Sequence, residues 1–178
     1  MCLLVDLADR GIVGHSAGRT RDASLVPGAF ATLDFPPADV QVFHTDRGGE
    51  FDNTRIDEPL DVFGIKRSLS RKGDPYDNAV VESTNRPLKK ELVYRNHYAT
   101  IEQLRHGLND YVWWSDNRRL HSALGYRSPK EFTEQGVYGQ INVYSVTTKS
   151  ERYERSYWTR TAAGNGIGGR KAPVPYGS

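Results

Sequence analysis

The chain has 178 residues, of which 37% are hydrophobic and 26% charged, a composition typical of a folded, water-soluble domain. Its single cysteine, Cys2, excludes an internal disulfide and a cysteine-based zinc site. No apolar run approaches the roughly 18 residues that span a membrane, and the N-terminal residues lack the basic region of a signal peptide. We therefore expect a cytoplasmic protein.

The net charge of +2 conceals an uneven distribution along the chain. Residues 36–65 carry 2 basic and 7 acidic side chains, net −5, whereas residues 66–96 carry 8 basic and 4 acidic ones, net +4. Such neighbouring blocks occur on ordinary solvated surfaces. They are also expected where carboxylates hold a cation beside basic groups that hold phosphates.

The first third of the chain predicts short strands and helices in alternation. Apolar runs rich in strand formers alternate with turn residues, and Gly64 follows a short helical pattern as its stop signal. The predicted elements are a hairpin over 2–18, a helix over 24–33, a strand over 40–44, a helix over 54–63 and a strand over 65–69.

The following part of the chain is predicted to be helical. A helix runs from Ala79 to about Tyr94 with Asp77 or Asn78 as its cap, another runs from Thr100 to about Asp116, and a short one starts at Ser128-Pro129.

The remainder of the chain, residues 135–178, has a different composition. It is rich in Gly, Thr, Ser and Arg and shows no periodic apolar face, apart from one candidate strand over 141–146. We therefore expect a domain over 1–134 and a poorly ordered tail over 135–178.

Two carboxylates stand where a metal site would be expected. Asp46 follows the predicted strand over 40–44, and Glu82 lies early on the predicted helix, with 35 residues between them. A carboxylate at a strand end and one in a first helical turn can meet at one edge of a sheet and bind a divalent cation such as Mg²⁺. Pairs of such ions serve phosphoryl transfer by stabilising the attacking and the leaving oxygen.

Basic residues follow Glu82 along the same helix. Arg86 and Lys89 lie four and seven residues after it and share its face, whereas Lys90 points further round the helix. This stripe suits a phosphodiester backbone laid along the helix, although an exposed helix with ordinary charge alternation has the same pattern.

Several motifs in one order resemble the catalytic core of insertion-sequence transposases of the retroviral-integrase type. They are FHTDRGGEF, the 35-residue gap, KGDPYDNAVVESTNRPLKKEL and the later NRRLHSALGYRSPKEF, and they cover about residues 2 to 134. The resemblance implies an RNase H-like α/β fold, in which a mixed sheet is flanked by helices. It also implies Mg²⁺ or Mn²⁺ as cofactor and chemistry on DNA ends.

The same resemblance implies roles for individual residues. Asp46 and Glu82 are the second aspartate and the glutamate of a catalytic, metal-binding triad, and Arg86, Lys89 and Lys90 are DNA-binding positions.

The resemblance also identifies a departure, because the first strand and its aspartate are missing. Residues 2–18 match the second and third strands, so the chain is expected to be truncated at the N-terminus. The nearest substitute, Asp6, falls in the hairpin and is a weak candidate. The missing strand is central in this fold, so its loss leaves two raw strand edges and predicts an unstable chain or one completed by a partner.

Some further side chains invite functional interpretations that we disfavour. Trp113 and Trp114 are predicted to serve helix packing rather than base stacking, because alternate aromatic faces on a helix usually bury one ring. His44 is predicted to be a hydrogen-bonded packing residue, and neither His44 nor His121 is predicted to be a metal ligand.

The leading functional hypothesis is a truncated transposase core that cleaves and joins DNA at transposable-element ends, with little activity of its own. Its partners are DNA and either a second copy or a full-length transposase, with no membrane, and its place is the cytoplasm at the nucleoid. The alternatives are a non-catalytic DNA-binding or inhibitory fragment, an unrelated RNase H-like nuclease, and a relic without function.

Overall fold

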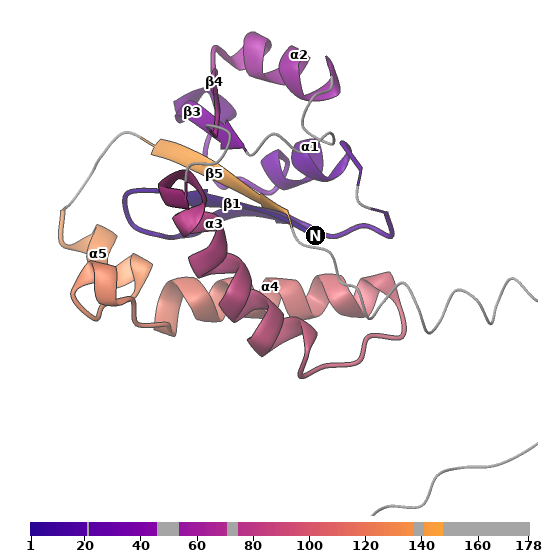
Figure 1. Cartoon of the computed structure of the whole chain (residues 1–178), viewed down its shortest axis with the longest axis vertical. Coiled ribbons are helices and arrows are strands. Elements are labelled where there is room, and N and C mark those ends of the chain that lie inside the picture. Colours follow the sequence, from indigo (N-terminus) through magenta and orange to yellow (C-terminus); the bar gives the residue numbers. More distant parts are fainter. Residues whose placement is uncertain (21, 46–53, 71–74, 137–140, 148–178) are drawn as a thin grey trace, which may run out of the picture.

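The computed structural model describes residues 1–20, 22–45, 54–70, 75–136 and 141–147, and shows a sheet with helices on both faces (Figure 1). The strands are β1 (Cys2–Asp6), β2 (Ile12–Ser16), β3 (Val40–Thr45), β4 (Lys66–Leu69) and β5 (Ile141–Thr147). The α-helices are α1 (Leu25–Phe30), α2 (Thr54–Phe63), α3 (Pro75–Leu88), α4 (Ile101–Arg118) and α5 (Pro129–Glu134). Shorter turns are 3₁₀ at Pro37–Asp39 and Ser122–Leu124, and π-helical at Lys89–Val93.

The five strands form one mixed sheet in the order β2-β1-β5-β3-β4. β1 is antiparallel to β2 and to β5, whereas β3 is parallel to β5 and to β4. This mixed α/β arrangement is that of an RNase H-like fold, as the sequence predicts.

The strand β5 lies at the centre of the sheet, where a gap is expected from the sequence. It pairs with β1 from Cys2 to Asp6 on one side and with β3 on the other, so neither neighbour has a raw edge. The prediction of two unpaired edges is therefore wrong. The prediction of a disordered tail also fails for β5, while the candidate strand over 141–146 is confirmed; residues 148–178 lie outside the described residues.

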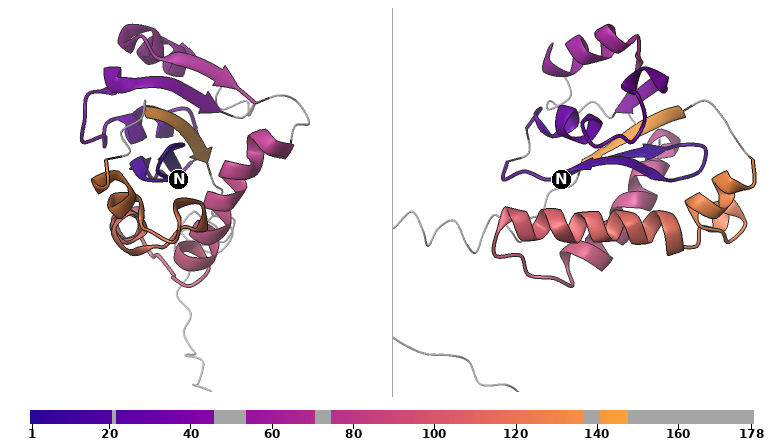
Figure 2. Two further views of the ribbon diagram at one scale, coloured as in Figure 1. Left: turned by 90° about the vertical axis from the view of Figure 1, so that its left-hand side faces the viewer. Right: turned by 180° about the vertical axis from the view of Figure 1, so that it is seen from behind.

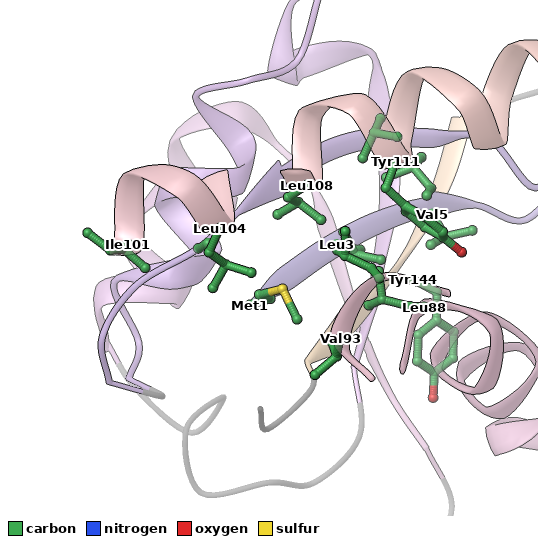
Figure 3. Packing of buried hydrophobic residues seen from close by; sticks show 14 residues of the cluster. Met1, Leu3, Val5, Leu88, Val93, Ile101, Leu104, Leu108, Tyr111 and Tyr144 are labelled. Atoms are coloured by element: carbon green, nitrogen blue, oxygen red, sulfur yellow. The ribbon is translucent and has the colours of Figure 1, made fainter. Parts of the chain in front are cut away.

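β1 is buried along its whole length and divides the core into two clusters. Its alternate side chains point to opposite faces of the sheet. Leu3 and Val5 pack with Tyr144 against residues of α3 and α4 (Figure 3), whereas Leu4 packs toward α1 and α2. Figure 2 shows the same layering from two further sides. Burial on both faces is what a central pair of strands requires, and it explains the unbroken apolar run at the start of the chain.

The helix ends follow the local sequence signals. The Thr100 side chain accepts a hydrogen bond from the Gln103 backbone N–H at the start of α4. Ser128 and Glu131 form a complete capping box at the start of α5. α3 begins at Pro75, four residues before the predicted Ala79, because proline is favoured in a first helical turn, so the prediction of Asp77 or Asn78 as its cap is wrong. None of the described helices is both long and apolar enough to cross a membrane.

A buried carboxylate ties α4 to the start of β2. Asp116 accepts a hydrogen bond of 2.9 Å from the Ile12 backbone N–H, and burial raises the pKa of this carboxyl to about 7, with Asp9 and Asp34 raising it further. In the unfolded chain the group titrates near 3.8. Because the folded state holds its proton more tightly, this group lowers the free energy of unfolding progressively as the pH rises from about 4 to 7.

Asp116→Asn should therefore stabilise the protein at neutral pH, since the amide oxygen can still accept from Ile12 but carries no charge. We expect a gain on the order of 2 to 4 kcal/mol at pH 8 and little difference at pH 4, measured as the variant minus the parent in thermal unfolding. An equal difference at both pH values would show that ionisation of Asp116 is not the cause.

Candidate functional site

The carboxyl end of β3 is held by a polar network that includes His44. Its Nδ1 lies 2.8 Å from the Ser68 hydroxyl and its Nε2 lies 3.1 Å from the Ser70 hydroxyl. Both ring nitrogens therefore have hydrogen-bond partners within the protein. This supports the prediction that His44 is a hydrogen-bonded packing residue.

The network reaches β5 through Tyr144. The Tyr144 hydroxyl lies 3.0 Å from the Ser70 hydroxyl, and the rings of His44 and Tyr144 are 4.5 Å apart between centroids. Ser70 also donates a backbone hydrogen bond to the carbonyl of Thr45, the last residue of β3. The end of β3 is thus fixed by β4 on one side and β5 on the other. Asp46, the next residue, lies outside the described residues.

Glu82 lies on α3, which packs against β5 (Figure 1). Its side chain is exposed, as is that of Arg86 one turn later on the same face. An exposed carboxylate on a helix that covers the centre of the sheet is available to a cation and to a polyanionic substrate.

The two lysines lie beyond a change in helical geometry. Pro87 stands inside α3, and the turn Lys89–Val93 that follows Leu88 is π-helical. Proline removes a backbone donor, and π-helical turns are one of the recognised ways in which a helix accommodates such a break. Lys90 is exposed and Lys89 half-buried, so the structure leaves Lys90 more accessible than the helical wheel alone indicates.

The centre of the sheet brings no further carboxylate to this site. The sequence of β5, INVYSVT, contains neither Asp nor Glu. Asp6 of β1 pairs with Val143 of β5, and Val143 pairs with Phe43 of β3. Asp6 is thus two strands away from β3 and two residues short of Thr45, which corresponds to a separation of about 12 Å. Its carboxylate instead accepts a hydrogen bond of 2.9 Å from the Ala8 backbone N–H. Asp6 is therefore the last residue of β1 and lies away from the end of β3.

No cluster of three or more His, Cys, Asp or Glu side chains suited to a metal ion occurs within the described ranges. The donor set that the sequence offers is Glu82 together with Asp46. Mg²⁺ is commonly bound by one or two carboxylates, with water and substrate phosphates completing its shell, so these residues fit one such ion.

The prediction that one of the two tryptophan rings is buried is wrong. Trp113 is 58% exposed and Trp114 is 41% exposed, so neither ring belongs to the core. Trp114 instead contacts the ring of Tyr111 and the guanidinium of Arg119, which lies 5.5 Å from its centroid. Helical periodicity places both rings at the rim of the α4 apolar face, where sequence alone does not distinguish buried from exposed positions.

Comparisons with known proteins show which family this chain resembles. Residues 63–129 match the family described as Integrase core domain. The chain is 35% identical over 131 residues to the transposase of insertion sequence element IS904 from Lactococcus lactis, covering 72% of this chain and 52% of that protein. It is 32% identical over 141 residues to transposase InsF of IS3fB from Escherichia coli, covering 77% of this chain and 49% of that protein.

The chain carries an integrase-type core related to those of insertion-sequence transposases. It spans about half the length of the curated relatives it matches.

Solved structures of integrase catalytic cores show the same fold. The HTLV-2 integrase catalytic core domain in complex with magnesium, in its dimeric form, superposes with a TM-score of 0.50 at 18% identity, covering 72% of this chain and 79% of that one. The catalytic core domain of BIV integrase gives 0.51 at 22% identity, covering 67% and 76%. At these identities the likeness establishes the RNase H-like fold.

Proposed function

We propose that this core acts in DNA transposition, by metal-dependent cleavage and strand transfer at transposable-element ends. The observation that carries the proposal is the position of α3. This helix bears the exposed Glu82 and packs against β5. β5 pairs with β3, the strand that ends directly before Asp46. The transposase relatives and the magnesium-bound integrase core support the same chemistry.

In this proposal Asp46, directly after β3, and Glu82 on α3 together hold a divalent cation. When bound there, Mg²⁺ or Mn²⁺ would stabilise negative charge at the reacting phosphate and lower the pKa of the attacking hydroxyl or water. The chain's own contribution is positioning. The hydrogen bonds around His44 fix the strand end, while Arg86, Lys89 and Lys90 orient the DNA backbone along α3.

The proposed partners are DNA and a second copy of the chain. Dimeric and trimeric forms and an intasome occur among the solved structures that share the fold. Catalysis on two element ends requires at least two sites, which supports an oligomer.

The test is a cleavage and strand-transfer assay in Mn²⁺ on a duplex carrying the element's ends. Glu82→Gln should abolish the metal-dependent product, a loss of at least about a hundredfold, because it removes one of two anionic ligands. The melting temperature should be unchanged, since the side chain is exposed. The matched control is Glu58→Gln, which removes an exposed carboxylate from α2 and should leave product formation unchanged. Equal activity in the two variants would contradict the assignment of Glu82.

A second candidate function is DNA binding without catalysis. It is favoured by the absence of a carboxylate from β5, the strand beside β3. In that case duplex binding survives Glu82→Gln, remains salt-dependent and is accompanied by no metal-dependent product.

A further inference from the structure

A second polar site lies beside α3, in a pocket of about 440 Å³. Its walls come from three places in the chain: the turn before β2, the middle of α3, and the end of α4 with the segment that follows it. The polar side chains that matter here are Arg10, Ser83, Thr84, Arg119, His121 and Ser122.

The lining of this pocket is that of an anion site. Two guanidinium groups, one imidazole and several hydroxyls line it, and among the lining residues that the structure describes none is Asp or Glu. Guanidinium groups bind phosphate oxygens through several N–H donors in a fixed plane. Arg119 also donates to Glu91, which anchors one nitrogen of its guanidinium and fixes the group at the wall of the pocket.

His121 supplies an independent indication of a missing ligand. Its Nε2 is buried and has no hydrogen-bond partner among the described residues, whereas buried polar atoms are nearly always paired. Burial lowers the pKa of this imidazole, and the positive charges of Arg119 and Arg10 lower it further, against a smaller opposing effect of Asp9. The electrostatic field at the ring is thus positive, which an anion would compensate.

We propose that this pocket binds a phosphodiester group of the DNA. The proposal rests on the proposed function for the choice of DNA, and on the lining for the choice of phosphate. Ser83 and Thr84 immediately follow Glu82 on α3, so a phosphate held here lies within about one helical turn, 5.4 Å along the axis, of that residue. The pocket thereby fixes the backbone of the strand that passes Glu82.

This proposal assigns a role to the later sequence motif, NRRLHSALGYRSPKEF. Arg119 and His121 belong to this motif, but their meeting with Arg10 depends on the turn between β1 and β2, more than a hundred residues earlier. Arg119 also has a structural role through Glu91 and Trp114, so its substitution would not separate binding from folding. Arg10 is the better probe.

The experiment measures duplex affinity of the whole chain in EDTA, so that metal chemistry plays no part. Arg10→Gln should weaken binding about threefold to tenfold and reduce the salt dependence by about one counterion, with an unchanged melting temperature. The matched control is Arg118→Gln, which removes the same charge from an exposed side chain outside the pocket lining and should weaken binding less than about twofold. Equal weakening by both variants, or none by Arg10→Gln, would overturn the proposal.

A second measurement follows the His121 ring by NMR, using inorganic phosphate and, separately, a short duplex. Binding of the duplex should move the His121 signals in the parent chain and move them less in Arg10→Gln. A response of the His121 signals to inorganic phosphate but not to the duplex would identify a site for a free anion and overturn the assignment to DNA. Because neither measurement uses a metal, a failure here is distinguishable from a failure of the proposed catalytic function.

Discussion

Val143→Asp is expected to abolish the folded state. Val143 is fully buried at the centre of the sheet, where β5 pairs with Asp6 of β1 and with Phe43 of β3. A carboxylate at this position has no cation or donor to pair with in the apolar cluster toward α1 and α2. Its desolvation costs several kcal/mol, which is comparable with the 5 to 15 kcal/mol, in order of magnitude, that stabilises a whole domain.

The measurement is thermal unfolding followed by circular dichroism. The matched control is Gln41→Asp, which adds the same charge to the exposed side chain of Gln41 on β3 and should shift the melting temperature by only a few degrees, about 0.5 kcal/mol or less. A cooperative transition of Val143→Asp at the temperature of the parent would contradict the central position of β5.

Val146→Asp is expected to increase the affinity of the chain for a metal ion. His44 of β3 pairs with Tyr144 of β5, and position 146 lies two residues further along β5. Residues two apart on a strand share a face, so position 146 lies on the face of Tyr144, whose side chain packs with Leu88 of α3. A carboxylate there would lie on the side of the sheet that α3 covers, which is the side of Glu82, near the end of β3 that precedes Asp46 in the sequence.

The expected result is Mn²⁺ binding at least about tenfold tighter than in the parent chain, because each added anionic oxygen ligand strengthens the binding of a hard cation. The matched control is Gln41→Asp, which adds the same charge on β3 but away from position 146, and should leave the Mn²⁺ affinity unchanged. An equal gain in both variants would show a general charge effect.

Local elements could be predicted well from the sequence because their signals are local. The helix Thr54–Phe63 agrees with its predicted range, and the caps at Thr100 and Ser128 are those expected from their side chains. The hairpin of β1 and β2 follows from two apolar runs around a turn.

The position of β5 could not be predicted in the same way. Its alternating pattern marks a strand, but its partners, β1 and β3, lie about a hundred residues or more away in the chain, and strand pairing over that separation leaves no local sequence signal. The same reason hides the pocket of Arg10 and His121, whose members meet only through tertiary packing. Trp113 and Trp114 show the limit of periodicity, because a ring at the rim of an apolar face satisfies the pattern without being buried.

We propose that Asp46, directly after β3, and Glu82 of α3 hold one cation, and that a carboxylate at position 146 of β5 would join them. The most direct test is a Mn²⁺ titration, followed by electron paramagnetic resonance, of the parent chain, Val146→Asp, Glu82→Gln and the double variant. We expect Val146→Asp to tighten the binding of Mn²⁺ and Glu82→Gln to remove most of this gain, since ligands of one ion are energetically coupled. The same gain from Val146→Asp with and without Glu82 would show that the two positions do not share a cation, and would contradict the site.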